Sequence, residues 1–374
     1  MFVAVHPDTE PVQRSTAFTD DVRAAPRAQT GHSISPRRFS ILIANYNYDR
    51  FLGRAIESAL AMDWPDIEVI VVDDGSTDNS REVIESFAGS ITAIYQDNSG
   101  QRIANNAAFA QSTGDVVVFL DADDALEPGF ATAVAAAWGP AVTKVQVQMQ
   151  LIDAEDRPFG DLIPDLSFRP EPAQITAWAR SSTEYPTPPG SANAYARRFL
   201  EQLFPIGPEH DSATDSTCLA LAPLMGDVVT VVEPLVLYRQ HGANDSNLGT
   251  RPDKFAREVA RAIKRQHTAE VICAQQGVEL PRPDSLRRSR HLLQLRAASL
   301  RLTPECHPMP GDGRLTAGID AIGSVFRRNF DPLKKRVIVA GWVLAVLAAP
   351  APLARKLIHK RFTERFENSE AATG

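Results

Sequence analysis

Acidic side chains gather at three places in the sequence, each at the end of an apolar run or the start of a predicted helix. Two pairs follow apolar runs and one residue precedes a helix: Asp73 with Asp74, Asp121 with Asp123, and Asp215. Two carboxylates in Asp-x-Asp spacing can hold a divalent cation, one of them directly and the other through a ligand or a water. Such a cation also takes phosphate oxygens, so the pattern predicts Mg²⁺ or Mn²⁺ together with a nucleoside diphosphate.

The sequence lacks the glycine-rich motifs that cradle phosphates in other nucleotide-binding proteins. Neither G-x-x-x-x-G-K nor G-x-G-x-x-G occurs in the 374 residues, which argues against a P-loop kinase and against a dinucleotide-dependent dehydrogenase. A carboxylate at a turn between a strand and a helix can instead accept hydrogen bonds from a base or a ribose. We therefore expect some of these acids to bind the nucleoside rather than the metal.

Apolar runs alternate with segments of helical spacing from residue 39 to residue 120. Runs such as Phe39–Ala44 are typical of strands that are buried on both faces of a parallel sheet. We predict strands at residues 39–44, 67–72, 91–95 and 115–120, and helices at residues 50–62, 78–87 and 103–111. This alternation predicts an α/β fold with a doubly wound, Rossmann-like sheet, in which ligands gather at the carboxyl ends of the strands.

The alternation weakens beyond residue 140. Residues 169–190 are rich in Pro, Ser and Thr and predict a long loop of the kind that lines substrate sites. Strands are predicted at residues 144–152, 228–233 and 235–239, and helices at residues 195–204 and 216–225. The predicted organisation is a flexible tail at 1–38, the α/β domain at 39–250, a helical extension at 251–330 and a basic, apolar C-terminal helix at 331–374.

Composition limits the partners and the compartment. The chain has 39 Lys and Arg against 46 Asp and Glu, a formal charge of -7, which argues against nucleic acid as a partner. Its three widely spaced cysteines form neither a disulfide framework nor a metal finger. No apolar stretch of signal-peptide length follows Met1. We therefore expect a cytoplasmic protein.

A series of motifs, in order, resembles the family 2 glycosyltransferases, which have the GT-A nucleotide-sugar-binding fold. The resemblance runs from Ser40 to about Asn247. It rests on Ile-Leu-Ile-Ala-Asn-Tyr-Asn at 41–47, Val-Val-Asp-Asp-Gly-Ser-Thr-Asp at 71–78, Gln-Asp-Asn-Ser-Gly at 96–100 with Ala-Asn-Asn at 104–106, Phe-Leu-Asp-Ala-Asp-Asp at 119–124 and Pro-Leu-Val-Leu-Tyr-Arg-Gln-His-Gly at 234–242. It implies a GT-A type, mostly parallel sheet and transfer of a sugar from a nucleoside-diphosphate sugar.

The resemblance also implies roles for the acidic residues. Asp74 would bind the nucleobase and ribose with Asp73 as its buttress, Asp121 would face the ribose and the metal, and Asp123 would be the direct metal ligand. His241 would be a metal ligand or a phosphate contact, although a core histidine fits the same position. The other substrate-binding residues implied are Ala44, Asn45, Tyr46, Asn98, Gly100, Asn106 and Arg239.

Asp215 is the candidate catalytic base. Inverting members of the family place an acid at the start of a helix about nineteen residues before the Pro of a Glu-Pro-Leu turn, and Pro234 counts back to Asp215. Thr214 stands where the family often has Glu, and a helix N-cap is the simpler role for Asp215. Glu209, His210 and Asp211 are nearby alternatives, while Ser191 and Asn193 are candidate acceptor contacts or parts of a plain turn.

Residues 337–354 are 18 residues without charge, between Lys334-Lys335-Arg336 and Arg355-Lys356. Pro350 and Pro352 shorten the usable helix, so the pattern favours an in-plane helix on anionic lipid over a membrane span. The alternative is a helix packed on the domain or on a partner. Attachment would place the protein peripherally at the inner face of the cell membrane, near a saccharide or lipid-linked acceptor.

The sequence thus predicts a metal-dependent, inverting glycosyltransferase, with a role in cell-surface polysaccharide or glycolipid synthesis. A nucleotidyltransferase with a related fold would release pyrophosphate instead of a nucleoside diphosphate. A non-catalytic module that binds a nucleotide sugar or a glycan in a membrane assembly is the alternative from another class. Thr214 in place of an acid is the feature that favours this module.

Overall fold

The computed structural model describes residues 36–166, 168–210, 214–241, 252–327 and 329–362. Most of the tail predicted at 1–38 therefore lies outside the described residues, as do the end of the predicted α/β domain at 242–250 and the last twelve residues of the predicted C-terminal helix. The division of the chain into four segments stays a prediction.

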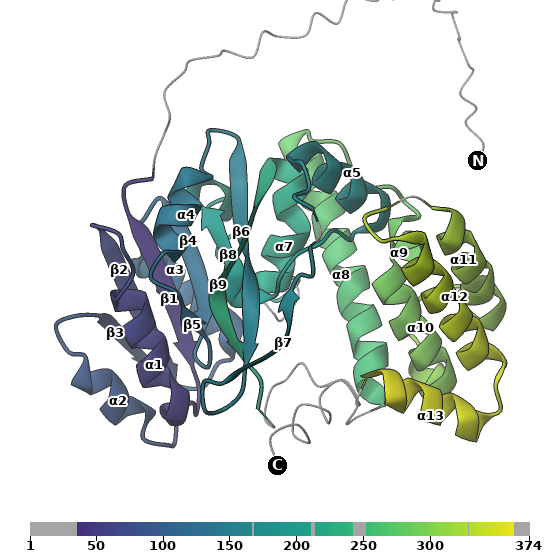
Figure 1. Ribbon diagram of the computed structural model, residues 1–374, viewed down its shortest axis with the longest axis horizontal. Helices are drawn as coiled ribbons and strands as arrows, with labels where there is room; N and C mark the ends of the chain where they lie inside the picture. Colours follow the sequence, from purple (N-terminus) through teal and green to yellow (C-terminus); the bar gives the residue numbers. More distant parts are fainter. Residues whose placement is uncertain (1–35, 167, 211–213, 242–251, 328, 363–374) are drawn as a thin grey trace, which may run out of the picture. The chain divides into compact units, whose positions relative to one another are not determined.

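The first half of the fold is a run of alternating strands and helices. In chain order these are β1 Phe39–Asn45, α1 Asp49–Leu60, β2 Ile67–Asp74, α2 Ser80–Ser86, β3 Thr92–Gln96, α3 Gln101–Gln111 and β4 Val116–Asp121. The four strands are parallel and lie in the order β3-β2-β1-β4, so β1 is central and the chain winds outward in both directions (Figure 1). The predicted α/β class with a doubly wound sheet is confirmed.

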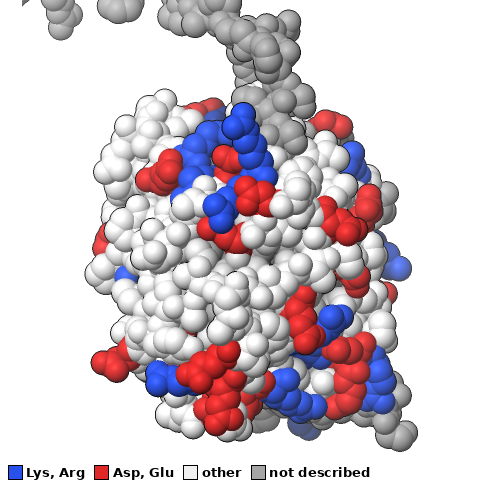
Figure 2. Space-filling model, turned by 90° about the vertical axis from the view of Figure 1, so that its left-hand side faces the viewer, with Lys and Arg blue, Asp and Glu red and all other residues white. Residues whose placement is uncertain are grey.

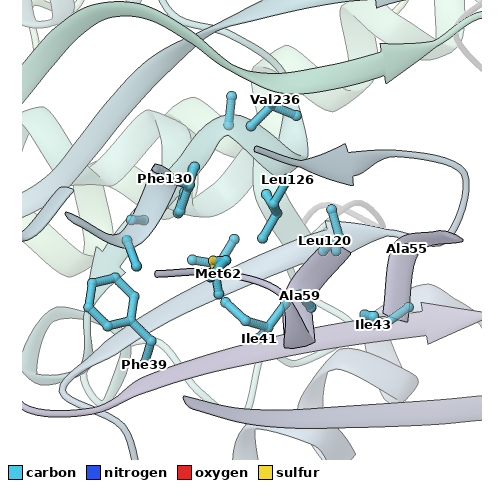
Figure 3. Packing of buried hydrophobic residues seen from close by; sticks show 14 of the residues in the cluster. Phe39, Ile41, Ile43, Ala55, Ala59, Met62, Leu120, Leu126, Phe130 and Val236 are labelled. Carbon is cyan, nitrogen blue, oxygen red and sulfur yellow. The ribbon is translucent and has the colours of Figure 1, made fainter. Parts of the chain in front are cut away.

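Side chains of the central strands are buried on both faces of this sheet. Along β1, Ile41 and Ile43 point into a core shared with α1, whereas Leu42 points into a second core on the opposite face. Figure 3 shows the first core, where side chains of β1 and α1 pack around Met62 and beside Phe130. Continuous apolar runs suit such strands because neither face meets water.

The second half of the sheet is mixed. It contains β5 Ala125–Leu126, β6 Val142–Ile152, β7 Pro158–Ile163, β8 Asn193–Ala196 and β9 Asp227–Arg239, with the helices α4 Phe130–Ala136, α6 Arg197–Leu200 and α7 Thr214–Met225. β8 pairs antiparallel with both β4 and β6, and β9 runs parallel to β6. Residues 195–196, predicted as helix, thus extend the sheet, since paired strands on both sides outweigh their helical spacing.

Two further predictions are wrong in detail. β9 is one strand rather than two, because shifts in its register with β6 accommodate Pro234. The predicted loop at 169–190 contains α5 Pro172–Ser182. Glu171 and Gln174 form a capping box at its start, and Pro172 occupies the first turn, where proline is tolerated.

The C-terminal part of the described chain is helical. It comprises α8 Asp253–Gln276, α9 Ser285–Arg288, α10 Arg290–Leu302, α11 Arg314–Phe326, α12 Leu333–Ala348 and α13 Ala351–Phe362. The uncharged stretch at 337–354 is divided between α12 and α13, with the break before Pro350. Within the described ranges, no helix has the length and apolar character that a membrane crossing requires.

Charges of both signs are mixed on the surface. Figure 2 shows one face, on which Lys and Arg side chains lie among Asp and Glu side chains. Ion pairs such as Arg50 with Glu155 and Arg54 with Asp156 are of this kind. That nucleic acid is not a partner stays a prediction.

Candidate active site

The strand pairing brings the predicted site residues to one edge of the sheet. At the carboxyl ends of the strands, Asn45 lies opposite Asp73, Asp74 lies opposite Gln96, and Ala44 lies opposite Asp121. The order of the strands reverses here, because β2 lies on one side of β1 and β4 lies on the other. Open α/β sheets hold their ligands at such a point.

Asp74 fastens the loop between β3 and α3. Its side chain accepts hydrogen bonds from the amide of Gln96 at 2.6 Å and from the backbone N–H groups of Ser99 at 2.9 Å and Gly100 at 2.8 Å. Gly75, with a φ of +75°, lies so close to this loop that a Cβ atom would meet the backbone nitrogen of Asn98 at 2.7 Å. Asn98 and Gly100 therefore lie beside Asp74 and Gly75, and their predicted contact with substrate stays a prediction.

Asp73 is buried and supports β1. The amide nitrogen of Asn45 lies 3.3 Å from Asp73 Oδ1 and 3.1 Å from the hydroxyl of Ser76. These contacts suit the role of a buttress. The neighbouring Tyr46 is 45% exposed and lies at the open edge of the sheet, where a planar base could stack on its ring.

The acids after β4 are held by a turn far away in the sequence. The hydroxyl of Ser191 donates to Asp124 at 2.6 Å and accepts from the backbone N–H of Asp121 at 3.1 Å. Gly190, the residue before Ser191, approaches the carboxylate of Asp121 so closely that a Cβ atom would lie 2.9 Å from Asp121 Oδ2. Burial, together with the charges of Asp123 and Asp215, raises the pKa of Asp121 to about 8.

Asp123 and His241 are adjacent although they lie 118 residues apart in the sequence. His241 Nε2 lies 2.9 Å from Asp123 Oδ2, and both side chains are about nine-tenths buried. The imidazole stacks on the ring of Phe51 at 5.1 Å between centroids and meets the edge of Tyr48 at 5.8 Å. Aromatic rings from the start of α1 and the residue before it thus orient the histidine toward the acid.

Arg239 is buried and holds the chain around these acids. Its backbone N–H donates to Asp124 at 2.9 Å, and its Nε donates to the carbonyl oxygen of Asp123 at 2.8 Å. The guanidinium also forms an ion pair with Asp156 at 2.5 Å. Through these contacts Arg239 holds the backbone and side chains of the acidic residues in place. Its predicted contact with phosphate stays a prediction.

Asp215 lies in the first turn of α7. Its charge adds to burial and to the charge of Asp123 in raising the pKa of Asp121. Its Oδ1 also accepts from the N–H of Ser216 at 2.7 Å. Of the alternative bases, His210 lies 3.1 Å from the hydroxyl of Thr268, and Asp211 is outside the described residues.

Two further candidates are occupied by contacts within the protein. The side chain of Asn106 makes two hydrogen bonds with the backbone of Ile206, at 2.9 and 3.0 Å. Asn193 is fully buried, accepts from Lys144 at 2.8 Å and donates to Gly190 at 3.0 Å. Both shape loops at the site, and their predicted contacts with substrate stay predictions.

The cluster fits a divalent cation that is completed by a ligand. Within the described ranges no three His, Cys, Asp or Glu side chains are placed to hold a metal ion by themselves. Mg²⁺ typically takes only one or two carboxylates from the protein and completes its shell with waters and phosphate oxygens. Asp123 and His241 could supply the protein ligands. Burial and the neighbouring acids raise the pKa of Asp121 and Asp124, and a cation would offset that concentration of negative charge.

Two positions in this cluster are absent from the predicted site residues. Asp124 was part of the quoted motif, but its function as a link between Ser191 and Arg239 depends on strands that are distant in the sequence. Gly190 carries no sequence signal, because its closeness to Asp121 arises from the pairing of β8 with β4.

Comparisons with known proteins identify the family of the first half of the chain. The model of the family described as glycosyl transferase family 2 matches residues 40–204. An uncharacterised glycosyltransferase from Nostoc sp. is 39% identical over 217 residues, which are 56% of this chain and 66% of that protein. Hyaluronan synthase from Pasteurella multocida is 39% identical over 92 residues, 24% of this chain and 10% of that protein. The chain therefore spans less than two thirds of the length of these relatives.

Among solved structures, TarS residues 1–349 of S. aureus with UDP-GlcNAc has a TM-score of 0.49 at 16% identity, over 87% of this chain and 91% of that one. The mannosyltransferase PcManGT of Pyrobaculum calidifontis, solved with GDP-Man and Mn²⁺, has a TM-score of 0.47 at 18% identity, over 86% and 85%. The chain belongs to glycosyl transferase family 2 through its residues 40–204.

Proposed function

We propose that the protein is a metal-dependent, inverting glycosyltransferase that moves a sugar from a nucleoside-diphosphate sugar to an acceptor hydroxyl. The observation that carries this proposal is the convergence of Asp121, the Asp123–His241 pair and Asp215 at the carboxyl edge of the sheet. A binding module for a glycan alone would not need a cluster of buried acids.

In this proposal the residues divide into binding and catalytic groups. Asp74 and the edge of β1 hold the nucleoside, while Asp123 and His241 hold the cation. The cation, when bound, stabilises the negative charge that develops on the departing diphosphate.

Asp215 takes the proton from the acceptor hydroxyl. The acceptor oxygen forms a bond to the anomeric carbon as the bond from that carbon to the diphosphate oxygen breaks. One displacement of this kind inverts the anomeric centre.

The proposal names the acceptor only by its chemical class. We propose a saccharide or a lipid-linked saccharide, in cell-surface polysaccharide or glycolipid synthesis at the inner face of the cell membrane. In this proposal the loop at residues 188–193, which contains Ser191 and Asn193, borders the acceptor.

The test is release of nucleoside diphosphate. Purified full-length chain is incubated with Mn²⁺ or Mg²⁺ and a panel of nucleotide sugars, with and without detergent-solubilised membrane lipids. We expect release from one donor, loss of release in Asp215→Asn with donor binding retained, and loss of metal-dependent donor binding in Asp123→Asn.

Asp63→Asn is the matched control, because Asp63 is an exposed acid outside the site. Pyrophosphate in place of nucleoside diphosphate would identify a nucleotidyltransferase. Binding of a donor without turnover, even with the lipids, would identify a non-catalytic module. Full activity in both site variants would refute the assigned roles.

A further inference from the structure

Helix α11 exposes its large apolar side chains and buries its small and polar ones. Its large apolar residues are exposed by 85% at Leu315, 69% at Ile319, 53% at Ile322 and 79% at Phe326. Their spacing of four, three and four residues places them on one stripe of the helix. The residues that face inward are small or polar, namely Ala317, Asp320, Ala321 and Ser324. An amphipathic helix of a protein in water normally has the opposite arrangement.

A buried arginine fixes this orientation. Arg296 of α10 is fully buried and donates to Asp312 at 2.7 and 2.8 Å and to Asp320 of α11 at 2.8 Å. Rotating α11 to bury its apolar stripe would remove Asp320 from Arg296 and leave the buried guanidinium with Asp312 as its one remaining acid among these two, which is costly in a protein interior. The outward stripe is thus built into the fold.

The stripe continues onto α12, which packs beside α11 (Figure 1). A Cβ atom on Gly318 of α11 would lie 3.8 Å from the side chain of Leu344. α12 also exposes apolar side chains of its own, which are 37–58% exposed: Leu333, Val337, Ile338 and Leu344. These four residues and the four of α11 are called the α11–α12 face below. Apolar surfaces this continuous usually mark an interaction site.

The C-terminal segment that contains α11 and α12 is rich in basic residues. Residues 314–362 contain ten Lys or Arg, namely Arg314, Arg327, Arg328, Lys334, Lys335, Arg336, Arg355, Lys356, Lys360 and Arg361, in a chain whose net charge is -7. The only acids in this range are Asp320 and Asp331, and both are buried and paired with Arg or Lys. The surface of these helices therefore complements a negative partner.

We propose that the α11–α12 face docks on an anionic lipid bilayer. Large aliphatic and aromatic side chains without hydrogen-bonding groups suit the acyl boundary, and the excess of basic residues in the same segment suits lipid phosphates. α11 and α12 would lie in the plane of the membrane, because neither meets the requirements of a span.

This surface differs from the one that the sequence suggests. Within residues 337–354, the side chains of Val339, Ala340, Val343 and Val346 are buried against the other helices and cannot enter lipid. The proposal assigns the largest part to α11, which the sequence does not single out. It is independent of the proposed sugar transfer, since it concerns a different surface.

The test is co-sedimentation of the full-length chain with vesicles. Vesicles of phosphatidylcholine alone are compared with vesicles that contain about one third phosphatidylglycerol, at low and high NaCl. We expect binding to the phosphatidylglycerol vesicles that weakens with salt. Leu315→Gln with Phe326→Gln should reduce the partition coefficient about tenfold or more, since each side chain loses its apolar contact with lipid. Lys334→Gln with Lys356→Gln should weaken binding mainly at low salt.

Leu280→Gln is the matched control, because Leu280 is an apolar residue that is 48% exposed outside this face. Thermal unfolding of each variant shows whether it is folded, and the substitutions at the two ends of α11 affect no buried side chain. Failure of the wild type to bind phosphatidylglycerol vesicles would overturn the proposal. Equal binding by the variant with both Leu315→Gln and Phe326→Gln would overturn it too. So would a result in which the wild type is a dimer that does not bind vesicles and the variant is a monomer, because the face would then join two copies of the chain. Donor turnover measured without vesicles tests the proposed function separately.

Discussion

His241 illustrates how single residues complete this site. Its ring is held between Phe51 and Tyr48, and its Nε2 faces Asp123. A ligand that is held in place by its surroundings loses less freedom when it binds a metal. The aromatic residues should therefore influence metal affinity although neither carries a metal-binding atom that the site uses.

Phe51→Leu tests this effect. We expect the concentration of Mn²⁺ needed for half-maximal activity to rise severalfold, while turnover at saturating Mn²⁺ changes little, because the histidine remains but is less well oriented. The measurement is a metal titration of nucleoside-diphosphate release. Phe87→Leu is the control, since Phe87 packs against the core between the sheet and α1 and is not one of the two rings that pack on His241. An unchanged metal requirement in Phe51→Leu would show that the ring does not orient the ligand.

Gly190→Ala tests the turn that borders Asp121. The new methyl group would lie 2.9 Å from Asp121 Oδ2, so the carboxylate must move. Displacement of a site group by a fraction of an ångström is costly, and we expect kcat/KM to fall about tenfold or more. Gly129→Ala is the control, because its methyl group would lie 3.8 Å from Leu235. Activity within twofold of the wild type would contradict the placement of this turn.

Some residues of the site could be predicted from the sequence and others could not. The acids after β2 and β4 could be predicted because each follows an apolar run that needs no partner to be recognised as a strand. Gly190 could not, because its importance comes from antiparallel pairing between residues that lie 70 or more positions apart. The contact of His241 with Asp123 could be expected only through the family resemblance.

At the scale of elements, α3 could be predicted from local sequence, whereas α5 and the orientation of α11 could not. α3 was predicted from the spacing of its apolar residues, whereas α5 follows a Pro-rich segment and depends on its capping box. The orientation of α11 could not be predicted from periodicity, since the same spacing of Leu and Ile ordinarily marks the buried side. The buried network around Arg296 decides the question instead.

Asp312→Asn tests that network. Hydrogen bonds from Arg296 and His307 outweigh burial and hold the pKa of Asp312 below its ordinary value. A carboxyl with a lowered native pKa stabilises the fold above its unfolded pKa of about 3.9, and this stability is lost as the pH falls further. We expect Asp312→Asn to cost about 3 kcal/mol of unfolding free energy at pH 7, since it removes one partner of a buried ion pair.

The difference between Asp312→Asn and the wild type should narrow as the pH falls below about 4, because the carboxyl of Asp312 is then protonated in the unfolded chain while it is still ionised in the folded one, which lowers the stability of the wild type. Urea unfolding at pH 7 and at a series of acid pH values measures it. Asp284→Asn is the control, because the ion pairs of Asp284 with Arg282 and Arg288 are exposed and worth at most about 1 kcal/mol. A cost for Asp312→Asn that does not depend on pH would contradict the role of its charge.

At the scale of the whole described molecule, α8 joins two cores. Ile272 and Cys273 near its end lie in the core beneath the sheet, together with side chains of α3 and α7. Phe255 and Val259 near its start lie in the core of the C-terminal helices. The boundary predicted at residue 250 therefore precedes a helix that contributes to both sides.

This shared helix predicts how the protein unfolds. Removing residues 251–374 would expose the part of the sheet core that α8 covers, and loss of one buried side chain the size of Ile272 costs about 2–5 kcal/mol. We expect the full chain to unfold in one calorimetric transition and the chain that ends at residue 250 to unfold at a lower temperature. A chain that ends at residue 280 retains α8 and should keep more of the stability of the sheet core. Two separate transitions in the full chain would show that the two cores are independent, as would a shorter chain that is as stable as the full one. A single transition would mean that the proposed membrane-docking helices and the active site share one folding unit.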